Sequence, residues 1–293
     1  MRVGFLTATC MLPGHPDERE DSWEHEAEFV PMESACAALG IQLEAVVWDD
    51  PQLRVSDYDA FVIGTTWDYA EKPQQFLEVL EQLSEAKPLF NSLDIVRWNL
   101  DKRYLVDLER KGIQVVPTLW RSAADQPTID AAFQELSCQE LVVKPQVGAS
   151  AWRQVRVKLG DPLPPAEELP LGACMIQPFL AAAVNEGEYS FLFFGGQFSH
   201  CALKRSAPGD YRVQSMYGGK EIIHEPSAAE LAQAAAVLQA VEEPLLYARV
   251  DMMRGADNEL LLMELELIEP YLYPVQGPRL GEAFANALHR LLG

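Results

Sequence analysis

The sequence has few basic residues and no long apolar run, and each shortage excludes a class of protein. Its 293 residues include 23 Lys and Arg against 44 Asp and Glu, which gives a net charge of −21. A chain this acidic repels nucleic acid and anionic membrane surfaces, so we expect neither as a partner. No apolar run reaches about 18 residues, so the sequence predicts no membrane span.

Cysteine is also scarce, and its placement predicts a cytoplasmic protein. The five cysteines are scattered along the chain without CxxC spacing. This distribution is typical of free thiols in a reducing compartment and argues against a zinc site. The start of the chain, MRVGFLTATC, has the pattern of a buried strand and lacks the regions of a signal peptide.

Two phosphate-binding motifs are absent as well. The chain contains no GxxxxGK[ST] loop, and no GxGxxG follows the first predicted strand. Strands and helices nevertheless alternate over residues 1–95, which predicts a parallel sheet covered on both faces. We therefore expect a Rossmann-like first lobe that binds a ligand other than a dinucleotide.

The remaining residues have a mixed α+β pattern. Strands are predicted at residues 115–120, 141–146, 153–159 and 174–180. A hairpin turning at Gly195-Gly196, a helix over about 227–241, two strands joined by the turn GADN, and a closing helix follow. The fold class expected for the whole chain is thus α/β followed by α+β.

Acidic residues interrupt the apolar stretch LLMELELIEPYLYP near the carboxyl terminus. Glu264 and Glu266 are two positions apart on a predicted strand and so share a face, and Asp251 on the preceding strand can face them. Converging carboxylates raise each other's pKa unless a cation lies between them, and Mg²⁺ prefers such oxygen ligands. The alternative is an edge strand whose glutamates face water.

Three lysines could meet this acidic cluster. Lys144 follows Leu-Val-Val in a predicted strand, where an unpaired ammonium group would be costly. Lys102 lies at a predicted helix start, and Lys204 lies in ALKR. Taken singly, each lysine is more typical of a surface position. Phosphate groups bridging the lysines and Mg²⁺ would satisfy both sets of charges.

Four motifs in order resemble the ATP-grasp superfamily of carboxylate–amine ligases over residues 96–293. They are NLDK, VVKP followed by QVGASA, MIQPFL, and ARVDMM with LLLMELELIEP. WDDP, TTWDY and VRWNLDKRYLVDL are similar to the subgroup containing the cyclo-ligase of cycloserine biosynthesis. Glutathione synthetase and D-alanine–D-alanine ligase are more distantly similar. The resemblance implies an ATP-grasp fold, with a lid over about residues 115–178 and a carboxyl-terminal lobe over about 179–293.

The resemblance also implies a role for individual residues. Asp251, Glu264 and Glu266 would hold Mg²⁺ or Mn²⁺, and Lys204 and Arg212 would stabilise the transferring phosphoryl group. The implied ATP contacts are Lys102 and Lys144 for the phosphates, Gly148, Ala149 and Ser150 for the lid loop, Gln177, Phe179 and Leu180 for the adenine, and Glu188 for the ribose. The chain departs from the family where Glu266 replaces the usual Asn and where the lid loop keeps a single glycine.

The implied reaction joins a small carboxylate, activated by ATP as an acyl phosphate, to an amine, with release of ADP and phosphate. Cyclisation within one molecule needs the same machinery. Amino-acid-like substrates are expected between the first and last lobes, where the candidate residues are Thr7, Thr66, Trp67, Asp68, Arg249, Glu269 and Tyr271.

Several alternatives stay open at this point. TTWDY could cap the first lobe by packing, and Glu269 reaches the cleft only if Pro270 bends the chain, because its parity is opposite to that of Glu266. An ATP-grasp phosphotransferase and a non-catalytic nucleotide-binding protein are the competing functions. Relatives are often dimers, so a homodimer is also expected.

Overall fold

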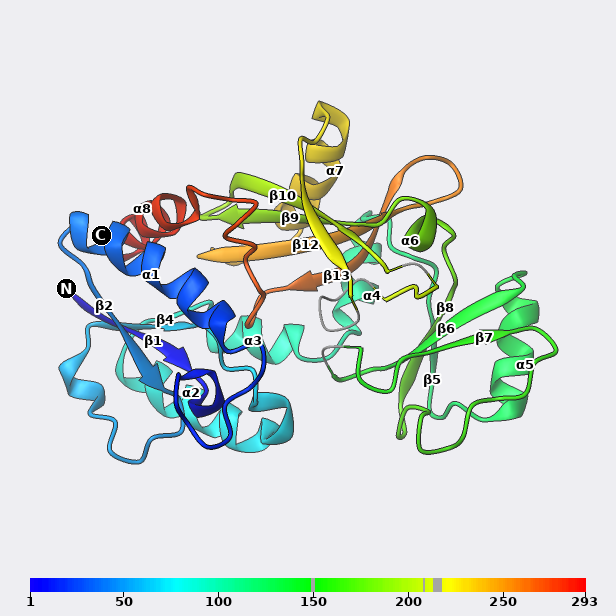
Figure 1. Ribbon diagram of the computed structural model, residues 1–293, viewed down its shortest axis with the longest axis horizontal. Helices are drawn as coiled ribbons and strands as arrows, with labels where there is room; N and C mark the ends of the chain where they lie inside the picture. The colour runs from blue at the N-terminus through cyan, green and yellow to red at the C-terminus, as the bar shows by residue number, and fades with distance from the viewer. Residues whose placement is uncertain (149–150, 208, 213–217) are drawn as a thin grey trace.

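Three sheets in a row form the protein, described by a computed structural model over residues 1–148, 151–207, 209–212 and 218–293 (Figure 1). The first sheet lies at one end beside both chain termini, the green lid sheet lies at the other end, and the third sheet lies between them. The α/β and α+β arrangement predicted from the sequence is confirmed.

The amino-terminal sheet is parallel, with strand order β2-β1-β3-β4. Its strands are apolar on both faces because helices cover both sides of a parallel sheet. Helices α1 and α8 (Leu280–Leu292) pack on one face, and α2 and α3 pack on the other. The elements are β1 (Arg2–Thr7), β2 (Gln42–Val47), β3 (Ala60–Ile63), β4 (Leu89–Phe90), α1 (Trp23–Ala38), α2 (Pro73–Ala86), α3 (Leu93–Asn99), and the 3-10 turns Thr9–Met11, Val55–Asp57 and Tyr69–Glu71.

The lid sheet is antiparallel, with order β5-β8-β6-β7 and helix α5 packed on it. The strand predicted over 115–120 is wrong in extent. Its first part instead reaches the central sheet, where the Val116 N–H donates to the Leu262 carbonyl at 3.0 Å. The elements are α4 (Tyr104–Arg110), β5 (Leu119–Arg121), α5 (Gln126–Glu135), β6 (Glu140–Pro145), β7 (Val155–Lys158) and β8 (Cys174–Pro178).

The central sheet is antiparallel, with order β11-β10-β9-β12-β13. One face is apolar and packs against α4 and α7. The other face is polar where it lines the cavity, and at its other end it carries Leu192, Phe194 and Tyr247, which pack against α8. The predicted hairpin turn is confirmed, since Gly195 and Gly196 have φ of 55° and 73°, values that favour glycine. The elements are α6 (Ala182–Asn185), β9 (Glu188–Phe194), β10 (Gln197–Arg205), β11 (Lys220–His224), α7 (Ala228–Gln239), β12 (Tyr247–Arg254), β13 (Leu260–Glu266) and α8 (Leu280–Leu292).

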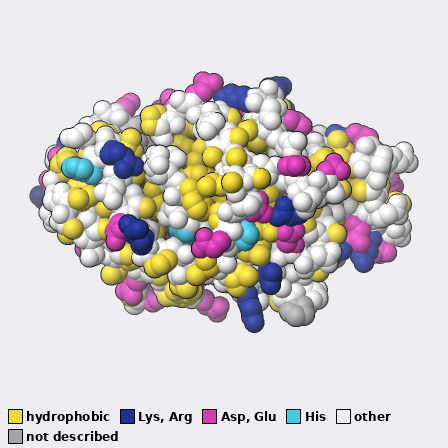
Figure 2. Space-filling model, turned by 90° about the horizontal axis from the view of Figure 1, so that it is seen from above, with side chains coloured by type: hydrophobic (Ala, Val, Ile, Leu, Met, Phe, Trp, Pro, Cys, Tyr) yellow, Lys and Arg dark blue, Asp and Glu magenta, His cyan; other side chains and the backbone are white. Residues whose placement is uncertain are grey.

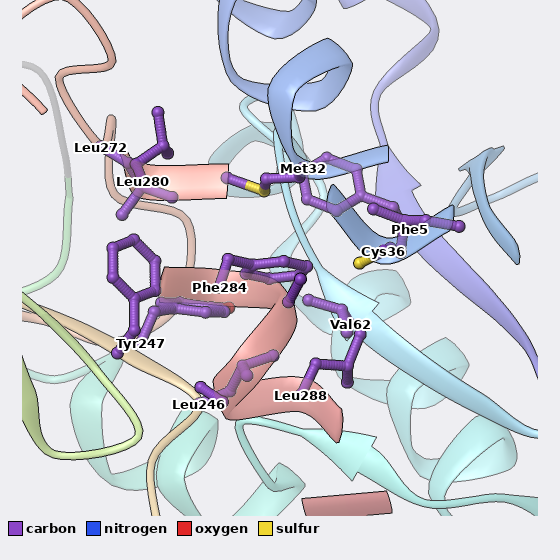
Figure 3. Close-up of a cluster of buried hydrophobic side chains, with 14 of the residues drawn as sticks. Phe5, Met32, Cys36, Val62, Leu246, Tyr247, Leu272, Leu280, Phe284 and Leu288 are labelled. Carbon is purple, nitrogen blue, oxygen red and sulfur yellow. The ribbon is translucent and has the colours of Figure 1, made fainter. Parts of the chain in front are cut away.

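One hydrophobic core joins the two ends of the sequence (Figure 3). Phe5 and Met32 from the first lobe meet Tyr247 and Phe284 from the last. The first lobe is therefore continuous with the central sheet in packing. The domain boundary near residue 95 stays a prediction.

The molecular surface agrees with the composition. In the view from above, hydrophobic side chains are numerous across the middle of the face, and charged side chains lie both among them and at the margins (Figure 2). Within the described ranges, no helix is both long enough and apolar enough to cross a membrane.

Candidate active site

The polar face of the central sheet carries paired charges in register. On β12 and β13, Arg249 is the cross-strand partner of Glu266, and Asp251 is the partner of Glu264. Cross-strand partners share a face, so these four side chains point to the same side of the sheet. The predicted convergence of Asp251, Glu264 and Glu266 on one face is therefore what the register produces.

A β-bulge in β13 explains how so many leucines coexist with these glutamates. The pairing shifts between Asp251, which faces Glu264, and Met252, which faces Leu262, so Met263 is the extra residue. Leu262 and Leu265 consequently both face the apolar core although their parity differs. The bulge sets the glutamates on the polar face.

Backbone groups at the open edge of β13 are hydrogen-bonded by side chains from α3 and α4. Asn99 donates to the Leu265 carbonyl at 2.8 Å and accepts from the Leu267 N–H at 3.0 Å. The Tyr104 hydroxyl accepts from the Leu265 N–H at 2.8 Å. The NLDK motif thus contributes an asparagine that fixes the strand carrying the glutamates.

Asp251 is buried in a cationic environment. It accepts hydrogen bonds from the Arg249 guanidinium at 3.0–3.2 Å, from Lys204 Nζ at 3.3 Å and from the Ser190 hydroxyl. Burial alone would raise the pKa of Asp251, but the charges of Arg249 and Lys204 outweigh it and hold that pKa below its ordinary value. Both cations therefore favour the carboxylate form of Asp251.

Lys204 also forms an ion pair with Glu188, its cross-strand partner on β9. Burial raises the pKa of Glu188 despite the attraction of Lys204. For Lys204 the balance is opposite: burial lowers its pKa, and the charges of Asp251 and Glu188 more than compensate. The predicted ribose contact and the predicted phosphoryl contact thus lie side by side.

Glu264 faces the lysines of the lid side. Lys102 Nζ lies 3.1 Å from Glu264 Oε1 and also donates to the Gly148 carbonyl. Burial would raise the pKa of Glu264, but Lys102 and then Lys144 outweigh it and hold that pKa below its usual range. Burial lowers the pKa of the Lys144 ammonium group, although Glu264 and Glu188 partly oppose this. The phosphate groups of a nucleotide could form ion pairs with both Lys102 and Lys144.

Glu266 and Glu269 differ from Glu264 in their surroundings. Glu266 forms an ion pair with Arg249, and burial raises the pKa of Glu266 to about 8. The chain bends directly after β13, at residues 268–269, so Glu269 reaches the same cavity; the bend comes just before Pro270. Burial raises the pKa of Glu269 to about 7, and the Tyr69 hydroxyl is its hydrogen-bond partner.

These residues line one cavity of about 720 Å³ between the three sheets. Its walls come from the first lobe, the lid and the polar face of the central sheet. The cavity collects most of the predicted site residues: Lys102, Lys144, Gly148, Gln177, Phe179, Leu180, Glu188, Lys204, Arg212, Asp251, Glu264, Glu266, Trp67, Arg249, Glu269 and Tyr271.

Three predicted residues in the described part of the chain, Thr7, Thr66 and Asp68, do not line this cavity. The Thr7 hydroxyl is hydrogen-bonded to the Thr65 hydroxyl at 2.8 Å, and the Thr66 hydroxyl is buried without a partner among the described residues. Asp68 accepts from the Trp48 indole at 2.7 Å, so it holds the first lobe together. Ala149 and Ser150 lie outside the described residues.

The lid side of the cavity offers a flat aromatic surface. The Arg156 guanidinium lies 3.5 Å from the centre of the Phe179 ring, and Tyr211 meets that ring edge-on. The Phe179 N–H donates to the Glu140 carbonyl at 2.9 Å, so an adenine edge would have to use neighbouring backbone groups. Arg212 forms a two-point pair with Asp210, at 3.1 and 2.7 Å.

The carboxylates fit a hard cation in chemistry, but they are paired with protein cations. Among the residues that the structure describes, no three His, Cys, Asp or Glu side chains are grouped closely enough to hold a metal ion. Asp251 and Glu264 are cross-strand partners whose pKa values are held low by neighbouring cations, and their carboxylate oxygens are the ligands that Mg²⁺ prefers. Glu266 could join them only if its partner Arg249 turned away.

Sequence reasoning missed part of the lining. Trp23 and Glu24 on α1, Glu221 on β11 and Tyr273 all line the cavity. For Trp23 and Glu24 the signal was the acidic stretch GHPDEREDSWEHE, residues 14–26. Such a stretch is also typical of a loop exposed to solvent. Tyr273 stands over Arg249, with the guanidinium 5.5 Å from the ring centre.

Comparisons with known proteins decide the family. Residues 3–91 match the family described as the amino-terminal domain of D-cycloserine synthetase DcsG. The cycloserine biosynthesis protein DcsG of Streptomyces lavendulae is 33% identical over 261 residues, which cover 84% of this chain and 87% of that protein. The chain belongs to the ATP-grasp ligases. Within them it falls in the cycloserine-synthetase subgroup, as the motifs predicted.

Solved ATP-grasp ligases share the whole fold. The crystal structure of D-cycloserine synthetase DcsG superposes with a TM-score of 0.82 at 26% identity, over 100% of both chains. D-alanine–D-alanine ligase from Bacillus anthracis, complexed with ATP, gives 0.65 at 17% identity over 99% of this chain and 95% of that one. The ligase PsnB, complexed with a minimal precursor, Mg and ADP, gives 0.66 at 14% over 100% and 97%. The ATP-grasp fold predicted from the sequence is confirmed.

Proposed function

We propose that this ATP-grasp ligase activates a small carboxylate as an acyl phosphate and then lets an amine displace the phosphate. A carboxylate oxygen bonds to the γ-phosphorus as the bond to ADP breaks. The amine nitrogen then bonds to the acyl carbon, phosphate leaves, and the amine releases a proton. The product is an amide, and the names of the DcsG relatives favour a cyclised amide from an amino-acid-like substrate.

One observation supports this proposal most strongly: a single cavity joins the phosphate-type cations to the carboxylate face. Lys102 and Lys144 would contact the nucleotide phosphates, and Lys204 lies directly beside Asp251. Arg212, from the loop after β10, would approach the transferring phosphoryl group from the lid side. Catalysis by positioning and charge neutralisation needs no covalent nucleophile.

The residues that fit Mg²⁺ are Asp251 and Glu264, with Glu266 as a third candidate. When bound, Mg²⁺ would neutralise the charge of the phosphates and orient them. Without a nucleotide, the chain's own cations neutralise these carboxylates, since Lys102 pairs with Glu264 and Arg249 pairs with Glu266. Binding of the nucleotide would let these cations turn from carboxylates to phosphates. Mn²⁺ would serve the same ligands.

The acceptor side would be formed by Trp67, Arg249, Glu269 and Tyr271. Arg249 is buried between Asp251 and Glu266 and donates to the Tyr271 carbonyl at 2.9 Å. It is therefore placed to orient a substrate carboxylate next to the phosphoryl group. Glu269 would orient the amine. We further propose a cytoplasmic homodimer, which sedimentation analysis would test.

Release of ADP tests the function. Purified protein with ATP and Mg²⁺ is expected to release ADP and phosphate when a suitable amino-acid substrate is added. A phosphotransferase would release ADP without needing an amine and would leave a stable phosphorylated product. Formation of AMP and pyrophosphate would contradict the acyl-phosphate scheme.

A further inference from the structure

The hydrogen-bonding groups of Arg249 are nearly all used by the described part of the chain itself. A guanidinium group has five N–H donors, arranged as forks that can each hold a carboxylate by two parallel bonds. The fork of Nε and Nη2 holds Asp251, at 3.1 Å from Oδ1 and 3.0 Å from Oδ2. Nη2 also donates to Glu266, and Nη1 donates to the Tyr271 carbonyl at 2.9 Å. Within the described residues, one N–H of Nη1 is all that remains for a ligand.

The surroundings of Arg249 also oppose the approach of an anion. Its side chain is 8% exposed, and the Tyr273 ring covers the guanidinium, with its centre 5.5 Å away. A substrate carboxylate could occupy the fork of Nη1 and Nη2 only by displacing Glu266. Glu266 would then lose its partner while it lies beside Asp251, and an unpaired carboxylate next to a second one is costly. Without a nucleotide, the site therefore disfavours the carboxylate that it has to bind.

The carboxylates that hold Arg249 belong to the group that fits a divalent cation. Asp251 and Glu264 are cross-strand partners, and Glu266, the partner of Arg249, points to the same side of the sheet. A cation bound by Asp251 and Glu266 would replace Arg249 as their counter-ion, so both forks of the guanidinium would become free. A substrate carboxylate beside Arg249 would then no longer face uncompensated negative charge.

We propose that Glu266 is a positioning residue that keeps Arg249 from binding the substrate carboxylate until the nucleotide and its metal ion are bound. This inference rests on the proposed ligase function and adds a binding order to it, with the nucleotide first and the acid second. The coupling is reciprocal, so the acid in turn tightens the binding of the nucleotide by the same factor. The acid is thereby excluded from a site in which it could not be phosphorylated.

The NMR signals of Arg249 test this inference without any turnover. The protein is labelled with ¹⁵N in its arginine guanidinium groups, and comparison with Arg249→Lys identifies the signals of Arg249. Sodium acetate is the carboxylate probe, with sodium chloride at matched ionic strength as the control. In the nucleotide-free protein, acetate is expected to shift these signals no more than chloride does. With Mg²⁺ and the non-hydrolysable ATP analogue AMP-PNP, acetate is expected to shift them in a saturable way.

The variant Glu266→Asn removes the charge and shortens the side chain, while it keeps an oxygen atom for a cation. Without nucleotide, this variant is expected to bind acetate at least about fivefold more tightly than the unaltered protein does, which is the lower end of typical coupling between sites. A gain of binding distinguishes this role from a structural one, because general damage to the site would weaken acetate binding. Asp257→Asn, which removes a charge from the exposed turn between β12 and β13, is the matched control and should behave as the unaltered protein does.

Three results would overturn the inference. The first is an equal, saturable response of Arg249 to acetate with and without Mg²⁺ and AMP-PNP in the unaltered protein. The second is a Glu266→Asn variant that, without nucleotide, binds acetate no more tightly than Asp257→Asn does. The third is the lack of a saturable response to acetate under every condition, because Arg249 would then not be a carboxylate-binding residue.

Turnover separates this inference from the proposed function. For an acid that stimulates ADP release, equilibrium dialysis is expected to show at least about fivefold tighter binding with Mg²⁺ and AMP-PNP than without them, and Glu266→Asn should reduce this difference. ADP release with the difference intact in Glu266→Asn would refute the role of Glu266 but not the ligase function. Nucleotide-dependent acetate binding that Glu266→Asn makes independent of nucleotide, with no ADP release from any acid, would support the role of Glu266 and refute the ligase function.

Discussion

At the scale of single residues, the active-site face consists of opposed charges whose pairing is specific. Asp251 is held by Arg249 and Lys204, while Glu264 is held by Lys102. Buried charges are tolerated because each has a partner, and removal of one partner is expected to leave an uncompensated charge. The same cations are available to phosphate groups.

ATP binding is expected to depend both on the lysines and on the carboxylates of the cavity. Addition of ATP with Mg²⁺ should raise the melting temperature of the unaltered protein, because a ligand that binds only the folded state stabilises it. Lys144→Ala removes a proposed phosphate contact and Glu264→Gln removes a proposed metal ligand, so each should lose most of this shift. Glu33→Gln, an exposed change on α1, is the control. Retention of the full shift in both site variants would refute the assignment.

Glu28 gives a pH dependence whose sign can be derived. Burial raises the pKa of Glu28 from 4.5 to about 8, and its carboxyl group accepts from the Leu272 N–H. Between these two pH values the folded protein holds a proton that the unfolded chain releases. The free energy of unfolding therefore falls as pH rises through this window, by about 1.4 kcal/mol per unit of pKa shift at most.

Replacement of Glu28 by Gln keeps an acceptor for Leu272 and removes the titration. We expect Glu28→Gln to be more stable than the unaltered protein at pH 9, by on the order of a few kcal/mol, and to gain much less at pH 6. Urea unfolding at both pH values measures this difference. The prediction fails if the gain is the same at pH 6 and pH 9.

At the scale of elements, the placement of β13 determines the site. Its edge is closed by Asn99 and Tyr104, and its bulge at Met263 sets the direction of Glu264. After β13, side chains from several elements form hydrogen bonds to the backbone of residues 268–273. Trp67 donates to the Glu269 carbonyl at 3.0 Å, and Tyr247 donates to the Ile268 carbonyl at 2.7 Å.

Asn99 is expected to be important for stability out of proportion to its size. Asn99→Ala would leave the Leu265 carbonyl and the Leu267 N–H without their partner. Each unsatisfied buried group costs about 1–3 kcal/mol, so loss of both should lower the free energy of unfolding by about 2–6 kcal/mol. Chemical denaturation measures it, with the exposed Asn185→Ala as the control. A loss no larger than that of the control would contradict this role.

The sequence could predict β13 and its acidic face but not several details of the site. The alternation of side chains identified Glu264 and Glu266. The bulge could not be predicted, because within a run of leucines both faces of the strand are apolar in the sequence. Helix α3 was not predicted. Thr66 and Asp68 follow a strand end as ligand-binding residues do, but neither lines the cavity. Thr66 is buried in the first lobe, and Asp68 accepts from the Trp48 indole there.

At the scale of the whole molecule, the carboxyl-terminal helix α8 returns to pack on α1. The two helices approach closely at Gly281, where a Cβ atom would lie 2.3 Å from the Pro31 carbonyl oxygen. This contact joins positions some 250 residues apart, so no local pattern in the sequence reports it. Apolar periodicity did predict a closing helix, because α8 is strongly amphipathic.

Replacement of Gly281 by Ala is expected to destabilise the protein, although alanine has the higher helix propensity. In an open helix, Gly→Ala stabilises by about 1 kcal/mol. Here Gly281→Ala should lower the melting temperature, because the added methyl group separates α8 from α1. Asn286→Ala, on the exposed face of the same helix, should leave the melting temperature unchanged or slightly raised. A stabilised Gly281→Ala would contradict the close packing.

The central claim, that ATP activates a carboxylate as an acyl phosphate, can be tested with an isotope. A carboxylate substrate labelled with ¹⁸O is incubated with the protein, ATP and Mg²⁺, and the released phosphate is examined by mass spectrometry. The proposed mechanism predicts ADP together with phosphate that carries one ¹⁸O atom from the substrate. Unlabelled phosphate, or AMP with pyrophosphate, would contradict it.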